Sequence, residues 1–384
     1  MTSSKGFAND HNQIMSILFS PFNIGPLDLP NRLVRSATAE RMADGDGRPL
    51  PPLKNLHTEL AKGGVGLIIT GHMYIHPSGK AHVEMTGVYS DDLLPDLSQL
   101  ANAVHDENGR IIVQINHGGM NCSRETVDEN FAPSAVDQPY VSRPAREITR
   151  KEIDNIIQAY ANAARRVQDA GFDGVQIHAA HGYLISQFLS PLINHRNDEW
   201  GGGITERMRF LKEISKAVRD QVGSDYPVLI KLGMIDGIQG GLTPEESLEV
   251  VAALEDMGID ALEISGGFSG GRSLNIRKGI RSQTDEAYFL HLAQRARKVT
   301  PLPVILVGGL RSRSVMEQVL IDGHADLISL SRPLISEPDL PNRLRLGLQE
   351  KSRCLSSNNC WPETVGEGIA CKCPHEKLTD KGKA

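Results

Sequence analysis

The stretch "DGVQIHAAHGYL" (residues 173–184) passes from apolar to polar side chains within a few positions. The run "GVQI" is mostly apolar and β-branched, which is typical of a strand that helices bury on both faces. Two histidines and a tyrosine, His178, His181 and Tyr183, follow at once. Polar side chains at the end of a buried strand indicate a pocket at that edge of a sheet.

Seven further apolar runs of this kind are spread along the chain. They are "LVRSA" (33–37), "VGLIITG" (65–71), "IIVQIN" (111–116), "PVLIKLG" (227–233), "ALEISGG" (261–267), "PVILVGG" (303–309) and "LISLSRP" (327–333). Amphipathic segments separate several of them, at residues 92–108, 149–171, 205–223 and 243–258. This alternation predicts an α/β protein of the (β/α)8 TIM barrel type, over residues 14–350. A doubly wound open sheet is the alternative, but "VRSATAERMADGDG" (34–47) lacks the glycine-rich dinucleotide turn of such a fold.

The ends of the helices and the flanking segments can also be predicted. "LFSPFNIGPLDLPNRL" (18–33) indicates a hairpin that covers the barrel floor. Residues 117–148 form a long irregular loop, and residues 351–384 form an irregular, cysteine-bearing tail. We expect helix N-caps at Thr149, Thr205 and Thr243, and helix ends at Gly171, Gly223 and Gly258.

The composition excludes several classes of partner. The 384 residues are 40% hydrophobic and 23% charged, with a formal net charge of −6, so nothing offers a basic field for nucleic acid or an anionic membrane. No apolar stretch reaches membrane-spanning length, and the first residues do not resemble a signal peptide. We therefore expect a cytoplasmic protein with a small-molecule substrate, no nucleic acid and no membrane.

The cysteines are unevenly distributed. Cys122 stands alone, and the other four are in the tail: Cys354, Cys360, Cys371 and Cys373. In a reducing compartment such a group favours metal binding, a redox role or no role at all, rather than disulfides.

The chemistry of a (β/α)8 barrel lies at the carboxyl ends of its strands. Gly308 and Gly309 follow the seventh run, and Arg332 follows the eighth. Barrels often bind a phosphate between those two loops, with backbone amides on one side and a cation on the other. The alternative is a tight turn and a surface arginine. The other polar residues at strand ends are Gln114, Asn116, His117, His178, His181, Tyr183 and Ser331.

Lys231 lies inside the apolar run "PVLIKLG", where an unpaired ammonium would be costly. It meets either an anion or electron-rich ring at the site, or an internal carboxylate in the barrel. The chemistry of His178, His181 and Tyr183 is more specific, because imidazoles donate hydrogen bonds to a carbonyl oxygen and a phenol transfers a proton. Zinc binding is the alternative, but no acidic residue at ligand spacing and no "HExxH" accompanies the histidines.

At this point the chain resembles the old yellow enzymes, which are FMN-dependent ene-reductases also called NADH:flavin oxidoreductases. The matching words are "NRLVRSA" (31–37), "GGVGLIITG" (63–71), "VQINHGG" (113–119), "FAPSAV" (131–136), the segment 170–210 and "SRPLISEPDLP" (331–341). The resemblance implies one FMN at the strand ends, NADH or NADPH as reductant, and an activated alkene as substrate. It also allows a homo-oligomer.

The resemblance also implies roles for individual residues. His178 and His181 match the pair that holds the substrate oxygen, and Tyr183 matches the acid that protonates the α carbon. Gln114 matches the residue at the flavin pyrimidine edge, and Lys231 matches the cation near N1 and O2. The remaining positions implied for the cofactor are Ser36, Ala37, Thr38, Ala39, His72, Gly308, Gly309, Ser331 and Arg332.

The chain also departs from the family pattern. Ala39 stands where many relatives have Thr or Cys, Lys231 where Arg is usual, and Met120 where Arg is common. Arg41 falls where some relatives place a substrate-facing tyrosine, so we expect it to contact substrate. These are the positions at which we expect the substrate range to differ from that of relatives.

The barrel part resembles 2,4-dienoyl-CoA reductase, a larger relative with a [4Fe-4S] cluster in a cysteine segment. Here Ser357 replaces the middle cysteine of that motif, so no metal is expected. The sequence is also compatible with two other functions. One is amine dehydrogenation by the same flavin, and the other is flavin binding with little turnover.

Overall fold

The computed structural model describes residues 16–136, 143–268 and 274–373. The first two residues of the expected barrel range, and the tail beyond residue 373, therefore lie outside the described residues. None of the helices in these ranges is both long and apolar enough to cross a bilayer.

Eight parallel strands form a closed barrel, as predicted. They run around it in chain order, and pairing of the second with the third and of the last with the first leaves no open edge. A short additional strand, β5 (Met73–Tyr74), extends the pairing beside the third. The barrel strands are β3 (Leu33–Arg35), β4 (Leu67–Ile69), β6 (Ile111–Asn116), β9 (Val175–Ala179), β10 (Val228–Gly233), β11 (Ala261–Ser265), β12 (Val304–Leu306) and β13 (Leu327–Leu330).

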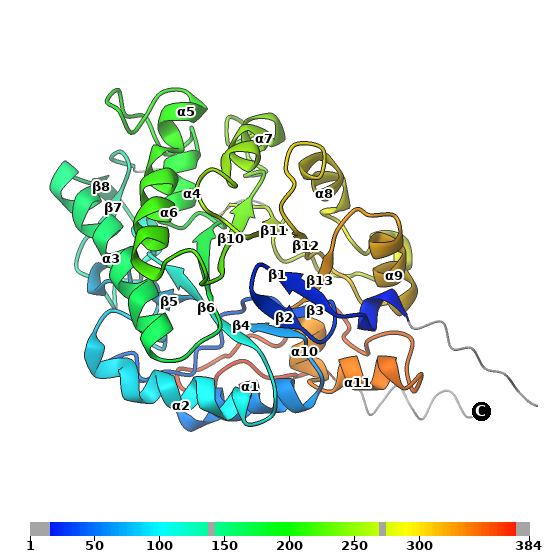
Figure 1. The fold of residues 1–384 in the computed structure, drawn as a ribbon. Helices are drawn as coiled ribbons and strands as arrows, with labels where there is room; N and C mark the ends of the chain where they lie inside the picture. Colours follow the sequence, from blue (N-terminus) through cyan, green and yellow to red (C-terminus); the bar gives the residue numbers. More distant parts are fainter. Residues whose placement is uncertain (1–15, 137–142, 269–273, 374–384) are drawn as a thin grey trace, which may run out of the picture.

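Helices cover the outside of the barrel (Figure 1). Their apolar faces and the outward side chains of the strands form one continuous buried cluster. The longer helices are α1 (Pro51–Lys62), α2 (Leu94–His105), α3 (Arg150–Asp169), α6 (Arg209–Val222), α7 (Pro244–Ala253) and α9 (Arg313–Ile321). The shorter ones are α4 (Leu184–Leu189), α5 (Ile204–Arg207), α8 (Leu290–Ala296), α10 (Arg332–Ser336) and α11 (Leu340–Arg345).

Two of the three predicted threonine caps are confirmed. Thr149 begins α3 and Thr243 begins α7, each in a capping box with the glutamate three residues later. The prediction for Thr205 is wrong, because α5 begins at Ile204 after Gly203 and a break at Met208 separates it from α6. Gly171 (φ 86°) and Gly223 (φ 79°) follow the ends of α3 and α6 in the left-handed region, as predicted. The prediction for Gly258 is wrong, because α7 ends at Ala253 and a turn separates it from Gly258.

The predicted N-terminal hairpin covers the barrel floor. Strands β1 (Phe22–Ile24) and β2 (Leu27–Leu29) pair antiparallel, and their apolar side chains join the interior residues at the amino ends of the barrel strands. The loop after β6 is less irregular than predicted. It contains a short 3-10 helix, η4 (Gly119–Asn121), and a parallel pair, β7 (Asn130–Ala132) with β8 (Ala145–Glu147).

The floor yields a stability prediction. Leu29 is 2% exposed, so Leu29→Ala would leave a cavity under the barrel and lower the free energy of unfolding by about 3 kcal/mol. Urea unfolding measures this loss. Leu348→Ala is the matched control, because Leu348 is 68% exposed and its loss should change the free energy of unfolding by less than about 0.5 kcal/mol. Equal effects of the two substitutions would contradict the assignment of the hairpin as a floor.

Candidate active site

A cavity of about 300 Å³ lies at the carboxyl ends of β12 and β13. Thr38, Gly309, Ser331 and Arg332 line it, and all four belong to the residues predicted to bind the cofactor. The far wall comes from the segment after the barrel, through Ser356, Asn358, Cys360, Trp361 and Ile369. The cavity therefore brings the first, seventh and eighth strands together with the tail.

The glycines after β12 allow close approach of a ligand to the backbone. Gly308 (φ 142°) and Gly309 (φ 72°) both have positive φ values. A Cβ atom on Gly309 would lie 2.9 Å from Cε1 of Tyr288, so a side chain does not fit. Across the cavity, Nη1 of Arg332 donates to the carbonyl of Arg277 at 2.8 Å and to Oδ1 of Asn358 at 2.6 Å. These contacts hold the guanidinium at the cavity wall.

Arg35 is a fully buried cation behind this wall, and the sequence interpretation missed it. Its Nη1 donates to the carbonyl of Ser36 at 2.8 Å and to the hydroxyl of Thr38, whose Oγ1 lies 2.8 Å from Oγ of Ser331. Its Nε and Nη2 have no partner among the described residues. Burial lowers the pKa of Arg35. Hydroxyls, the Gly309 backbone and the Arg332 guanidinium line one cavity, and the Arg35 guanidinium lies behind Thr38. This donor set fits a cofactor carrying phosphate, such as FMN.

Lys231 lies inside the barrel and is paired there. Its Nζ is 2.9 Å from Oε1 of Glu263 and donates to Oγ of Ser36 at 2.8 Å. Lys231 therefore contacts an internal carboxylate, and its predicted contact with the cofactor stays a prediction. Gln114 lies in the same buried layer, on β6.

Four aromatic side chains gather at the ends of β4 and β9. The ring centroids of His178 and His181 are 5.3 Å apart, and Tyr183 lies 5.0 Å from His178 and 4.9 Å from His72. His181 has a left-handed backbone (φ 61°), and its Nε2 is 2.7 Å from Oγ of Ser265. The structure thus brings the three predicted catalytic residues together and adds His72 to them.

Burial keeps these side chains uncharged. It lowers the pKa of His178, lowers that of His181 to about 3 and lowers that of His72 to about 4. Burial also raises the pKa of Tyr183 to about 12. The cluster therefore offers neutral imidazoles and a protonated phenol at neutral pH.

Arg41 is engaged by the segment after the barrel. Its Nε donates to Oε2 of Glu84 at 2.8 Å, and its guanidinium lies 5.8 Å from the ring centroid of Trp361. The other oxygen of Glu84 accepts from the amide of Gly366 at 2.6 Å. Arg41 has a left-handed backbone (φ 56°), and Ala37 and Ala39 are half-buried in the same loop.

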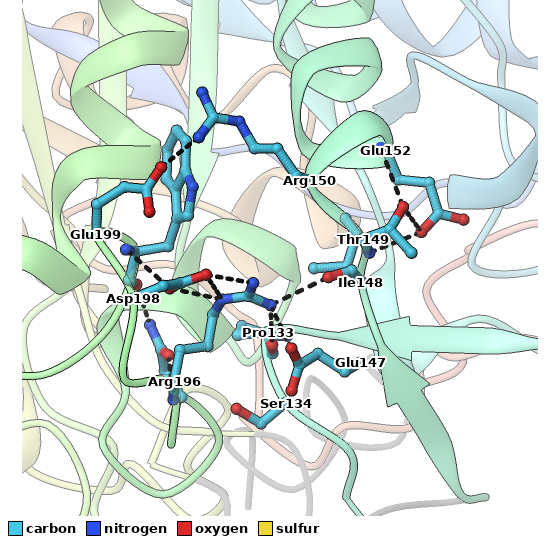
Figure 2. A network of polar contacts seen from close by, with 12 residues as sticks. Pro133, Ser134, Glu147, Ile148, Thr149, Arg150, Glu152, Arg196, Asp198 and Glu199 are labelled. Carbon is cyan, nitrogen blue, oxygen red and sulfur yellow. Dashed lines mark hydrogen bonds and ion pairs between the residues drawn. The ribbon is translucent and has the colours of Figure 1, made fainter.

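A second polar network holds the loops after β6 and β9 together (Figure 2). Arg196 binds the carboxylate of Asp198 and donates from Nη1 to the carbonyls of Pro133 at 2.8 Å and Ile148 at 3.0 Å. The amide of His195 donates to Oγ of Ser134 at 2.9 Å. These contacts anchor the long loop and its apolar cluster, which includes buried Met120.

The four tail cysteines lie close together around a small cavity. Cys354, Cys360, Cys371 and Cys373 line a cavity of about 10 Å³, the space of one water molecule, together with Ser357. Within the described ranges, no group of three or more His, Cys, Asp or Glu side chains is placed to hold a metal ion. None of these four cysteines is in a disulfide with another described residue, and Cys360 also faces the larger cavity.

Comparisons with known proteins agree with this geometry. Residues 17–351 match the family described as NADH:flavin oxidoreductase / NADH oxidase. The chain is 34% identical to an NADH oxidase of Thermoanaerobacter brockii over 93% of its own length and 55% of the relative's. It is 30% identical to a 4,4'-dithiodibutanoate disulfide reductase of Rhodococcus erythropolis, over 92% of the chain and 94% of the relative. The structure of an old yellow enzyme homologue from Zymomonas mobilis superposes with a TM-score of 0.76 at 27% identity, covering 92% and 99% of the two chains. The chain spans about half the length of the first curated relatives it matches.

The lowered pKa values lead to a prediction about the histidines. His72, His178 and His181 should stay neutral from about pH 8 to pH 5, so their ring resonances should not shift in an NMR titration over that range. The unfolded chain binds protons at these rings below about pH 6.5 whereas the folded chain does not, so stability should fall as the pH drops below that value. Single histidine-to-alanine variants assign the resonances. Titration of these rings near pH 6.5 would contradict the buried, neutral site.

Proposed function

Because the chain belongs to the NADH:flavin oxidoreductase / NADH oxidase family, we propose that it reduces activated C=C bonds of α,β-unsaturated carbonyl compounds. FMN is its cofactor, and NADH or NADPH is the reductant. When bound, FMN supplies hydride transfer, first from the nicotinamide and then to the β carbon of the alkene.

The observation that carries the proposal is the neutral cluster of His178, His181 and Tyr183. Two neutral imidazoles donate hydrogen bonds to the carbonyl oxygen of the substrate, which withdraws electrons from the double bond. Tyr183 keeps its proton because burial raises its pKa to about 12, so it is available as the acid for the α carbon. Ring centroids 5.0 to 5.3 Å apart allow all three groups to face one small substrate.

The cofactor would be held by the residues of the cavity and of the buried layer. Gly308, Gly309, Ser331 and Arg332 would hold its phosphate, with Arg35 adding a second positive charge behind Thr38. Gln114 and Lys231 would hold the pyrimidine end of the ring, Ser36, Ala37, Thr38 and Ala39 would follow its length, and His72 would contribute backbone. Arg41 would contact the substrate.

A second candidate substrate is an organic disulfide. Among the relatives described above, the disulfide reductase of Rhodococcus erythropolis matches this chain over nearly the whole length of both. Two electrons from the cofactor and two protons convert one disulfide into two thiols, so the same reduced protein can be offered both substrates. Anaerobic mixing with cyclohexenone or with 4,4'-dithiodibutanoate, followed by the return of the flavin absorbance, distinguishes them.

Two further functions are tested by the same preparation. Reduction of the bound flavin by trimethylamine, with no reoxidation by cyclohexenone, would favour amine dehydrogenation. Slow reoxidation by every substrate would favour a flavin-binding protein with little turnover. A purified protein without a visible flavin spectrum would overturn the proposal itself.

The role of Tyr183 gives a sharp prediction. Tyr183→Phe removes the proton donor and should slow cyclohexenone reduction about 100-fold, while reduction of the flavin by NADH or NADPH stays within about twofold. Stopped-flow absorbance separates these two half-reactions. Tyr89→Phe is the control, because the Tyr89 hydroxyl contacts the carbonyl of Asp46 outside the site. An unchanged alkene rate in the Tyr183→Phe protein would contradict the assignment.

A further inference from the structure

A layer of six polar side chains crosses the barrel interior above its apolar floor. The floor consists of the aliphatic residues at the amino ends of the strands and of the hairpin. In the strand register, Gln114 pairs with Gln176 and Lys231 pairs with Glu263. The members of the layer, all buried, are Ser36, Gln114, Gln176, Lys231, Glu263 and Ser329.

Glu263 is the centre of this layer. Its Oε1 accepts from Oγ of Ser36 at 2.7 Å and from Oγ of Ser329 at 2.8 Å, and it lies 2.9 Å from Nζ of Lys231. Its Oε2 accepts from Nε2 of Gln176 at 3.0 Å. Burial by itself would raise the pKa of Glu263, but the Lys231 ammonium and these hydrogen bonds outweigh it and lower that pKa. Glu263 is therefore a charged carboxylate whose two oxygens are both engaged.

The carboxylate also sets the orientation of two amides. A carboxylate only accepts hydrogen bonds, so the Gln176 amide must turn its NH2 group toward Glu263. This leaves Oε1 of Gln176 to accept from Nε2 of Gln114 at 2.7 Å. Gln114 then keeps its own Oε1 and one N–H for a ligand. Glu263 thus determines, through Gln176, which hydrogen-bonding groups Gln114 presents.

We propose that Glu263 is the positioning residue of the cofactor layer, holding Lys231 in place, offsetting its charge and orienting Gln114. The proposal rests on the proposed function, in which Lys231 and Gln114 meet the pyrimidine end of FMN. It adds a charge effect that Lys231 alone would not produce. Reduction would add negative charge to a bound flavin, which the Lys231 ammonium would favour and the Glu263 carboxylate would oppose.

The test is the reduction potential of FMN bound to the Glu263→Gln holoenzyme. Removal of the carboxylate charge leaves Lys231 without its counter-ion, so the reduced flavin should bind at least tenfold more tightly relative to the oxidised flavin. For a two-electron couple this is a rise of ~30 mV, measured against a reference dye. The dissociation constant of oxidised FMN should also rise, because the new amide places a donor opposite Gln176 and disturbs Gln114.

Two further variants keep the test decisive. Glu263→Asp keeps the carboxylate charge on a shorter side chain. The reduction potential of FMN bound to this variant should therefore lie closer to that of the unmodified protein than the potential in Glu263→Gln does. Glu337→Gln is the matched control, because Glu337 is a buried carboxylate outside the layer, where Gln349, Ser352 and Arg353 hold it. The reduction potential of FMN bound to this variant should equal that of the unmodified protein.

The outcomes separate this proposal from the proposed function. An unchanged FMN potential in a Glu263→Gln protein that retains FMN would overturn the role of Glu263 without bearing on the proposed function. A rise in the FMN potential of the Glu263→Asp protein as large as that of the Glu263→Gln protein would overturn it as well, because the carboxylate charge is still present. Absence of FMN from the unmodified protein would instead reject the proposed function.

Discussion

The pairing of β4 with β6 closes the sheet, and the position of every candidate residue depends on that closure. In a closed parallel barrel all carboxyl ends lie at one rim, so residues far apart in sequence meet there. Ser36, directly after the first strand, lies within hydrogen-bonding distance of Lys231 on the fifth and Glu263 on the sixth. An open sheet would separate its two edge strands and could not hold this layer together.

Closure also explains why polar residues are tolerated in the barrel interior. The side chains of the Glu263 layer form hydrogen bonds to one another across neighbouring and facing strands. The apolar floor below excludes water from that layer. The histidine cluster near the rim is also buried away from water, and this desolvation keeps His178 and His181 neutral.

The sequence predicted the parts that short-range patterns govern. The apolar runs predicted all eight strands. The position of His178, His181, Tyr183 and Arg332 at or after strand ends predicted that they lie at one rim. Glu263 and Gln176 were missed although they carry the signal that singled out Lys231, a polar side chain inside an apolar strand. Arg35 and the tail could not be placed, because their contacts depend on tertiary packing. The amide of Gly366 reaches Glu84 across 282 residues of sequence, and no local pattern encodes that meeting.

The segment after the barrel spans the cavity from one side to the other. Asn358 contacts Arg332 and the carbonyl of Ile276 on one side, and Gly366 contacts Glu84 on the other. Ile369 donates its amide to the carbonyl of Glu40 between them. The cavity wall on this side is therefore complete only where the segment after the barrel is docked on Arg332, Glu40 and Glu84. A molecule that binds in the cavity would also stabilise the docked position of that segment.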